Sequence, residues 1–355
     1  MDTKEFKAAV DLLVKERGID KQIIYDALEL ALTSAYKKNY QSLPNVRVSI
    51  DDEKGQVKVY SFMTVVDEVT DERTELTLEE AQKLVPDIKV GETIEEEVTP
   101  KDFGRVAAAT AKQVVIQKIR EAERNNIIEE YGDKQDEMVS GLVAMEDVRN
   151  YYIDLGKTQG ILPKSETIPG ETIKMGSNIK VYITKVENNS KGPIILLSRN
   201  HYGFVKRLFE LEIPEINEGI ILIYSVARDA GNRTKIAVYS EMSNVDPIGS
   251  CIGERGSRIN NIIKELNGEK IDIIAYDNDP AKFIENALSP AKNLSVFITD
   301  EKKKEALVIV DNENLSLAIG KKGSNVRLAA RLTHYKIDVK TVEQAKEDGI
   351  NIVLE

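Results

Sequence analysis

The sequence CIGERGSRINNIIKELNGEKIDII at residues 251–274 returns in a similar form as AIGKKGSNVRLAARLTHYKIDVK at residues 318–340, and this repeat indicates the architecture of the chain. Gly253 and Gly256 align with Gly320 and Gly323 at an offset of 67 residues. The Ile-Asp pair near the end of each copy aligns at an offset of 66, so the second copy is one residue shorter. Two copies of one pattern indicate two copies of one structural unit.

The segments before each copy repeat as well. Two strand-like runs precede each copy, namely GIILIYSVA (219–227) and TKIAVYS (234–240), then LSVFITD (294–300) and EALVIVD (305–311). A helix is predicted before each pair of runs, at about 201–210 and about 280–288. The repeat unit is therefore helix, two strands, short helix, GxxG, helix and strand (αββααβ).

Glycines at both ends of a GxxG loop let the backbone approach a ligand closely and turn sharply into the next helix. The N-terminus of that helix offers free N–H groups and a partial positive charge. A KH domain uses this arrangement to clamp the backbone of single-stranded nucleic acid, with the bases over an apolar groove between helix and sheet. The predicted clamp residues are Gly253, Arg255, Gly256 and Arg258 in the first copy, and Gly320, Lys321, Lys322, Gly323 and Arg327 in the second.

An isolated GxxG is usually a plain helix–loop–helix turn, and only the repetition of the whole αββααβ frame favours a ligand-binding loop. Charge separates the two copies, since residues 300–340 hold nine Lys and Arg against six Asp and Glu, whereas residues 228–274 hold seven of each. Glu254 lies inside the first loop, where it would repel phosphate. We therefore expect the first clamp to be weaker than the second, or to depend on Arg255 and Arg258.

The region before the repeats has a different sequence pattern. Residues 134–200 contain five short β-prone runs punctuated by glycine and proline, which predicts a small OB-type barrel. Such barrels often carry exposed aromatic rings that stack on bases. Tyr151 and Tyr152 are adjacent, so on a strand one faces the core and the other the surface. Edge-strand packing and base stacking are equally open for the surface ring.

Residues 1–133 mix helices with strands. Helices are predicted at 1–16, 21–40 and 77–85, strands at 46–50, 56–66 and 94–100, and a long helix at about 103–131. Lys101, Arg105, Lys112 and Arg120 fall within an arc of about 100° on and just before the long helix, interrupted by Glu123. This stripe is either a solvated face or a basic ridge that faces RNA or another acidic surface.

The 355-residue chain has a formal net charge of −11, which argues against a polyanion binder that acts by bulk charge. The acidity is concentrated at the front, because residues 1–133 hold 19 Lys and Arg against 28 Asp and Glu, a net of −9. A single cysteine excludes a disulfide scaffold and a Cys-based zinc site, and two histidines leave little for His-based metal chemistry. No apolar run approaches the ~20 residues of a membrane span, and the charged start does not read as a signal peptide. A reducing cytoplasm is therefore expected.

Three segments carry a resemblance to a known family: KDFGRVAAATAKQVVIQKIREAER (101–124), DPIGSCIGERGSRINNIIKELNGEKIDII (246–274) and LSLAIGKKGSNVRLAARLTHYKIDV (315–339). They are long, gapless and ordered as in the NusA family of bacterial transcription termination and antitermination factors, which the chain resembles nearly end to end. The resemblance implies a multidomain α+β protein. Its parts would be an N-terminal RNA polymerase-binding domain (1–133), an S1 OB-fold domain (134–200), two type II KH domains (201–278 and 279–345) and a C-terminal tail (346–355).

The same resemblance implies a cytoplasmic, non-enzymatic elongation factor that needs no cofactor or metal and acts as a monomer. Its partners would be RNA polymerase near the RNA exit channel, nascent single-stranded RNA and other Nus antitermination factors, with no membrane. It would support hairpin-dependent pausing and intrinsic termination, or antitermination. The family's basic positions on the long N-terminal helix correspond to Arg105 and Lys112, which would meet the nascent hairpin, and Arg120 extends that ridge. The acidic C-terminal repeats of some members are not expected here.

Two other functions use similar modules. An RNA-processing enzyme would need a carboxylate cluster for metal ions, but the acidic runs at 51–53 and 95–97 read as loops and exposed strand ends. The sequence GKKGS at 320–324 also lacks the spacing of a Walker loop. A translation regulator would use the same RNA modules on the ribosome. The alternative to an elongation factor is therefore an RNA-binding regulator that acts in RNA processing or translation.

Overall fold

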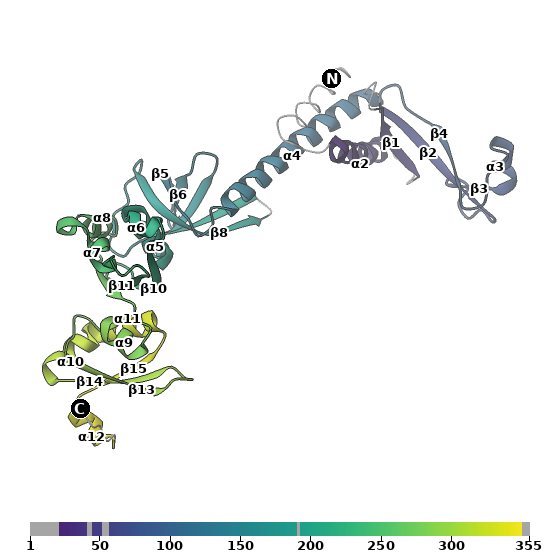
Figure 1. The fold of residues 1–355 in the computed structure, drawn as a ribbon. Coiled ribbons are helices and arrows are strands. Elements are labelled where there is room, and N and C mark those ends of the chain that lie inside the picture. Colours follow the sequence, from purple (N-terminus) through teal and green to yellow (C-terminus); the bar gives the residue numbers. More distant parts are fainter. Residues whose placement is uncertain (1–20, 41–44, 52–56, 190–191, 350–355) are drawn as a thin grey trace. The chain divides into compact units, whose positions relative to one another are not determined.

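The computed structural model describes residues 21–40, 45–51, 57–189 and 192–349, and the chain forms two compact units, Met1–Asn126 and Ile127–Glu355 (Figure 1). The helix predicted at 1–16 and the last residues of the predicted tail lie outside the described residues. Both units combine helices with strands, which confirms the predicted α+β class. In the part of the chain that the structure describes, no helix has the length and apolar character that crossing a bilayer requires.

The first unit is built on a four-stranded sheet around one long strand. Its elements in chain order are α2 (Lys21–Tyr40), β1 (Val46–Ile50), β2 (Val57–Val66), β3 (Glu75–Thr77), α3 (Leu78–Leu84), β4 (Thr93–Glu97) and most of α4 (Phe103–Gly132). The central strand β2 pairs antiparallel with β1 and β4 and parallel with β3. The helices predicted at 21–40 and at about 103–131 are confirmed as α2 and α4.

Residues at helical spacing bury one side of α2 and one side of α4. The buried stripes are Ile24, Leu28 and Leu32 on α2, and Phe103, Ala107, Ala111 and Val115 on α4. Both stripes belong to one core with the valines of β1 and with Val59 of β2. Because residues 103–120 of α4 bury only this stripe, the opposite face of that part of the helix is available for the charged residues of the predicted ridge.

The second unit begins with a closed five-stranded barrel, as predicted. Its strands are β5 (Met138–Glu146), β6 (Asn150–Asp154), β7 (Gln159–Pro163), β8 (Asn178–Asn189) and β9 (Gly192–Ser198), with the short 3-10 helix η1 (Lys164–Glu166) after β7. Around the barrel the order is β5-β6-β7-β9-β8. A Cβ on Gly160 would lie 2.4 Å from the Cδ1 atom of Leu197, so only glycine lets β7 approach β9 this closely.

Two copies of the predicted αββααβ unit follow the barrel. The first repeat unit comprises α5 (Tyr202–Glu212), α6 (Pro214–Asn217), β10 (Ile221–Asp229), β11 (Arg233–Ser240), α7 (Pro247–Ile252), η2 (Glu254–Gly256), α8 (Ser257–Glu265) and β12 (Lys270–Ala275). The second comprises α9 (Pro280–Ala287), β13 (Leu294–Asp300), β14 (Glu305–Val310), α10 (Asn312–Ile319), η3 (Lys321–Gly323), α11 (Ser324–Thr333) and β15 (Lys336–Lys340), and α12 (Val342–Glu347) follows it. In each unit the middle strand pairs antiparallel with the strand before it and parallel with the strand after it.

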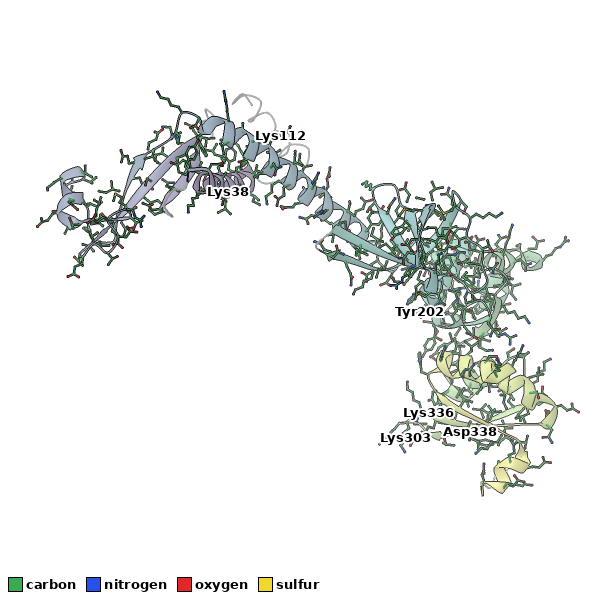
Figure 2. The ribbon with its side chains drawn as sticks, turned by 180° about the vertical axis from the view of Figure 1, so that it is seen from behind. Lys38, Lys112, Tyr202, Lys303, Lys336 and Asp338 are labelled. Atoms are coloured by element: carbon green, nitrogen blue, oxygen red, sulfur yellow. The ribbon has the colours of Figure 1, made fainter. Side chains whose placement is uncertain are left out.

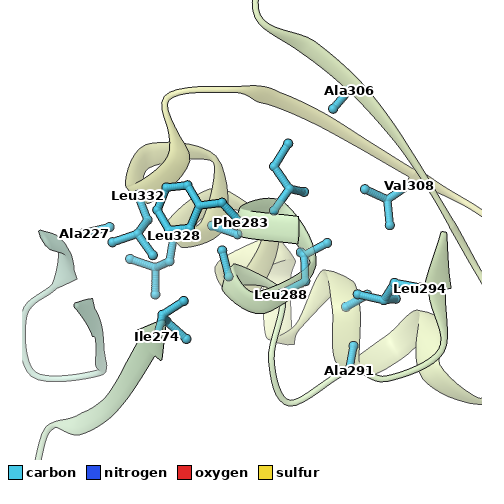
Figure 3. Close-up of a cluster of buried hydrophobic side chains, with 14 of the residues drawn as sticks. Ala227, Ile274, Phe283, Leu288, Ala291, Leu294, Ala306, Val308, Leu328 and Leu332 are labelled. Carbon is cyan, nitrogen blue, oxygen red and sulfur yellow. The ribbon is translucent and has the colours of Figure 1, made fainter. Parts of the chain in front are cut away.

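The two repeat units share one apolar core (Figure 3). Ala227 and Ile274, from the sheet of the first unit, pack with Phe283, Leu328 and Leu332, from the helices of the second. The sheet of the first unit is therefore covered by its own helices on one face and by the helices of the second unit on the other. This packing fixes the position of the two GxxG loops relative to each other.

A buried arginine joins the barrel to the first repeat unit. Arg199, at the end of β9, is 5% exposed. Its guanidinium donates to Glu171 at 3.0 Å and to the Lys180 carbonyl oxygen within the barrel, and to Glu265 of α8 at 3.1 Å. Buried, charge-assisted contacts of this kind hold two domains in one orientation.

Candidate nucleic-acid interface

The two GxxG loops have nearly the same backbone conformation. The (φ, ψ) pairs of the first loop are 75°, 173° at Gly253, 52°, 26° at Arg255 and 77°, 16° at Gly256. Those of the second are 75°, 171° at Gly320, 54°, 29° at Lys322 and 73°, 19° at Gly323. All six residues have positive φ, which is strained for arginine and lysine, and strain of this kind gathers at ligand-binding sites.

The first glycine of each loop is required by crowding as well as by its backbone angles. A Cβ on Gly253 would lie 2.7 Å from the Cγ atom of Arg258, and a Cβ on Gly320 would lie 2.7 Å from the backbone nitrogen of Asn325. Around Gly323 the nearest atom would be 3.9 Å away, so this position faces open space. At Gly323 it is therefore only the positive φ that favours glycine, and the space beside it leaves room for a ligand.

The helices that follow the loops begin without a side-chain cap. Asp246, Asp279 and Asp311 cap α7, α9 and α10, each by accepting a backbone N–H of the first turn. In contrast, the N-caps of α8 and α11 are Gly256 and Gly323, and no side chain of the described residues accepts their first-turn N–H groups. The free N–H groups of a helix N-terminus bind anions such as phosphate, so both loops end in an anion-accepting helix start.

Four of the predicted cations lie exposed beside the loops. They are Arg255 at the first loop, and Lys321, Lys322 and Arg327 at the second. Within the described residues, none of the four takes part in an ion pair. Arg258 is different, because its Nη1 atom donates to Glu215 at 2.8 Å and to the Ser250 carbonyl oxygen at 2.7 Å. The structure therefore places four predicted residues toward solvent and turns the fifth back into the fold.

Two carboxylates lie at the first loop. An open depression of about 580 Å³ beside it is lined by Asp246, Gly249, Ser250, Gly253, Glu254, Ser257 and Arg258. Glu254 is exposed within the loop, and Asp246 caps the helix before it. No carboxylate occupies the two inner positions of the second loop, which are Lys321 and Lys322. The local charge thus differs between the two loops in the direction that the sequence predicts.

An apolar strip adjoins each loop. Four half-buried residues occupy equivalent positions in the two units, namely Ile248, Ile259, Ile271 and Ile273 in the first and Leu315, Val326, Ile337 and Val339 in the second. In each unit they come from the helix before the loop, the helix after it and the last strand. Apolar surface of this kind beside a phosphate-binding loop suits the flat faces of unpaired bases.

The two neighbouring tyrosines of the barrel have separate environments. Tyr151 packs against the barrel core, with the ammonium of Lys164 5.2 Å from its ring centroid. The Tyr152 hydroxyl donates to Asp147 at 2.8 Å. This bond, with backbone N–H groups of Arg149 and Asn150, lowers the pKa of Asp147 to about 2. Each ring keeps a partly exposed surface.

Arg105, Lys112 and Arg120 all lie exposed on α4, away from the buried stripe that begins at Phe103 (Figure 2 labels Lys112). No ion pair engages these three side chains among the residues that the structure describes. Arg105 and Arg120 are separated by 15 positions, about 22 Å along the helix axis. Lys118, on the same helix, is instead paired with Glu121 at 2.9 Å.

Sequence reasoning missed Glu215, Asn260 and Asn325 at this interface. Glu215 lies 43 residues before its partner Arg258, and nothing local predicts that pairing. The asparagines were visible in the repeat itself, because Arg258 aligns with Asn325 and Asn260 aligns with Arg327 at the offset of 67. This exchange of arginine and asparagine between the two copies was the feature of the sequence that could have indicated different roles for the two positions.

Comparison with known proteins places these features in one family. The chain matches the family models for the NusA N-terminal domain at residues 5–125, the S1 RNA binding domain at 133–198, the NusA-like first KH domain at 199–276 and the NusA-like second KH domain at 280–347. It is 50% identical over 348 residues to a Bacillus subtilis protein, covering 98% of this chain and 94% of that one.

Two further relatives have similar coverage. A protein of Halalkalibacterium halodurans is 49% identical over 346 residues, covering 98% of this chain and 90% of the relative. A protein of Thermus thermophilus is 41% identical over 351 residues, covering 96% and 90%. All three relatives carry the name transcription termination/antitermination protein NusA. With four matched domains in order and relatives of this identity, the chain belongs to the NusA family.

Proposed function

We propose that this protein is a non-enzymatic transcription elongation factor that binds RNA polymerase and nascent single-stranded RNA. Through these contacts it modulates pausing, intrinsic termination and antitermination. The observation that carries the proposal is the pair of GxxG loops, which share one backbone conformation, open on exposed cations and lie in a fixed arrangement. Two such loops at a fixed distance can bind two points of one continuous RNA strand, whereas a small ligand would contact a single loop.

The RNA contacts divide between phosphates and bases. The backbone N–H groups at the starts of α8 and α11, with Arg255, Lys321, Lys322 and Arg327, would hold phosphates. The apolar strips beside the loops would hold bases. Each loop alone would bind weakly, and attachment to the polymerase raises the effective concentration of the nascent strand.

The N-terminal domain would bind RNA polymerase, with its net charge of −9 over residues 1–133 directed toward a basic surface. The exposed cations Arg105, Lys112 and Arg120 would then face the emerging RNA hairpin. Other Nus factors would join the same complex in the cytoplasm, with this protein present as a monomer.

In vitro transcription on a template with a hairpin-dependent pause tests the proposal. Adding the protein should lengthen the pause, and adding a Gly323→Asp variant should lengthen it less. A pause half-life that is the same with and without the wild-type protein would reject an elongation role. Binding to free RNA without any effect on the polymerase would favour the alternative, a regulator of RNA processing or translation.

A further inference from the structure

We infer that Arg258 is a positioning residue that holds the first KH loop in shape, and that Arg255 is the phosphate-facing cation of that loop. The inference rests on the proposed RNA-binding function and assigns roles within it. Its starting point is the exchange of side chains between the two KH domains. Arg258 and Asn260 stand in the first domain where Asn325 and Arg327 stand in the second.

Arg258 and Asn325 bind the same backbone position in their domains. The Nη1 atom of Arg258 donates to the carbonyl oxygen of Ser250 at 2.7 Å. The Nδ2 atom of Asn325 donates to the carbonyl oxygen of Leu317 at 3.1 Å, and Leu317 is the equivalent of Ser250 at the offset of 67. Both carbonyls belong to the last turn of the helix before the loop. Each side chain therefore donates to a carbonyl that has no partner within its own helix, and this bond stabilises the last turn of that helix.

Both side chains also connect the loop to a helix that precedes the sheet of their domain. Arg258 bonds to Glu215 of α6 at 2.8 Å, and Asn325 donates to the carbonyl oxygen of Leu288, the C-cap of α9, at 2.9 Å. Arg258 and Asn325 further lie directly beneath the first glycine, where a Cβ would meet either side chain at 2.7 Å. Two equivalent contacts, with the helix carbonyl and with the first glycine, and a third contact with a helix before the sheet indicate one structural role. A charged group carries it out in the first domain and a neutral amide in the second.

The second half of the exchange concerns the ligand side of the loop. Arg327 is exposed, and its Nη1 atom would be 3.9 Å from a Cβ on Gly323. The equivalent Asn260 is exposed too, with its Nδ2 atom 3.3 Å from a Cβ on Gly256. The ligand side of the second loop therefore carries an arginine where the first carries an amide.

The charge available to RNA follows from these roles. The second loop offers Lys321, Lys322 and Arg327, whereas the first offers Arg255 beside the carboxylate of Glu254. Phosphate contacts release counterions, so binding at the second loop should weaken steeply with salt and binding at the first only slightly. The two KH domains thus bind one RNA strand through different interactions. The second domain uses mainly charge, and the first uses mainly backbone N–H groups and its apolar strip.

The decisive experiment exchanges the two side chains of the first loop in the full-length chain. Arg258→Asn with Asn260→Arg, made in a Gly323→Asp background, gives the first loop the arrangement of the second. The introduced amide should take over the bond to Ser250, and the introduced guanidinium should face the ligand. Binding of a short single-stranded RNA should tighten, and the slope of log K against log[salt] should steepen by about 0.7, the value for one more phosphate contact. An unchanged or shallower slope would overturn the inference.

Two single variants in the same background separate the roles of the arginines. Arg258→Met keeps the aliphatic stem under Gly253 and removes both polar bonds. We expect it to weaken RNA binding up to about tenfold with an unchanged salt slope. Arg255→Met should lower the magnitude of the slope by about 0.7. A lower slope for Arg258→Met would show that Arg258 contacts phosphate, which would contradict the inference.

Failure of the proposed function would look different. In that case Arg255→Met, Arg258→Met and the exchange variant would all bind the RNA with the affinity and salt slope of their Gly323→Asp parent. A thermal unfolding scan accompanies each variant. If Arg258→Met fails to fold, the exchange variant still decides the question, because its asparagine is the residue that the second domain uses at this position.

Discussion

The ammonium of Lys235 donates to the carbonyl oxygen of Ser289 at 2.7 Å and thereby joins the sheet of the first KH domain to the start of the second. Lys235 is fully buried and also lies 3.0 Å from Asp272. It stands on β11 next to Ala237, which belongs to the shared core. The bond adds a polar contact to the apolar core that holds the two GxxG loops in a fixed arrangement.

Removing this lysine should destabilise the pair of KH domains. Lys235→Ala removes the donor to the Ser289 carbonyl and leaves Asp272, among the described residues, with Arg233 at 3.3 Å as its one cationic partner. Breaking one partner of a buried ion pair lowers the free energy of unfolding by about 3 kcal/mol. The matched control is Lys336→Ala, which removes an exposed ion pair with Glu305 and should change stability by less than about 1 kcal/mol. Urea denaturation of both variants tests this, and equal losses would contradict it.

The two glycines of the second loop should respond differently to substitution. Gly320 has both a crowded Cβ position and a backbone region that is almost confined to glycine, so Gly320→Ala should lower thermal stability strongly. Gly323 lies in the left-handed region with open space around it, so Gly323→Asn should fold well.

The same position separates charge from shape in RNA binding. Aspartate and asparagine side chains have nearly the same size, but Gly323→Asp brings a carboxylate to the start of α11, where phosphate would bind, and Gly323→Asn brings a neutral amide. We expect the aspartate variant to lose at least about tenfold in RNA affinity relative to the asparagine variant. Fluorescence anisotropy with a labelled single-stranded RNA measures the difference. Equal affinities would mean that this loop does not meet phosphate.

The repeated parts of the fold were predictable because their signals are local. Paired glycines at a constant offset, and strand and helix patterns before them, are enough to specify both αββααβ units and both loops. The barrel followed in the same way from short β-prone runs between turn residues. The long helix α4 was predictable from its apolar stripe, which begins at Phe103 and repeats every four residues.

Roles that depend on distant partners were not predictable. Within TKIAVYS, strand alternation sets Lys235 on the face away from the helices, which in an isolated unit would be solvated. It is buried because a second domain covers that face. Likewise Arg258 and Arg327 look alike as loop cations. Their alignment shows that they are not equivalent positions, but the contact that turns Arg258 into the fold comes from Glu215, far away in the sequence. Tertiary contacts of this kind carry no periodic signal.

The junction between the barrel and the first KH domain should be sensitive to acid through His201. Its Nδ1 atom accepts the N–H of Gly203 at 3.1 Å, and its ring stacks on Tyr182. Burial lowers the pKa of His201 below its ordinary value. Near pH 6.5 the unfolded chain therefore binds a proton that the folded chain does not, so stability should fall as the pH drops below about 7 and continue to fall until the lowered pKa is passed.

His201→Asn isolates this contribution. Asparagine is a good N-cap for α5 and has no proton to gain in this range. Urea denaturation between about pH 7.5 and pH 5 should show a smaller loss of stability for the variant than for the wild type. Parallel curves for the two proteins would show that His201 does not carry the effect.

The exposed cations of α4 provide the last test, on the N-terminal domain. Arg105→Glu, Lys112→Glu and Arg120→Glu together reverse three charges, and none of these three side chains forms an ion pair among the described residues, so the fold should be retained. If each charge contributes about 0.5–1 kcal/mol to contact with the RNA hairpin, the triple variant should weaken that contact by at least about tenfold. The pause half-life on a hairpin template should then fall toward its value without the protein. Lys38→Glu is the matched control, since Lys38 is an exposed cation on α2 of the same domain (Figure 2). A solvated face without a role predicts wild-type pausing for both variants, whereas a basic ridge predicts a loss confined to the triple variant, and general charge repulsion from the polymerase complex predicts a loss in both.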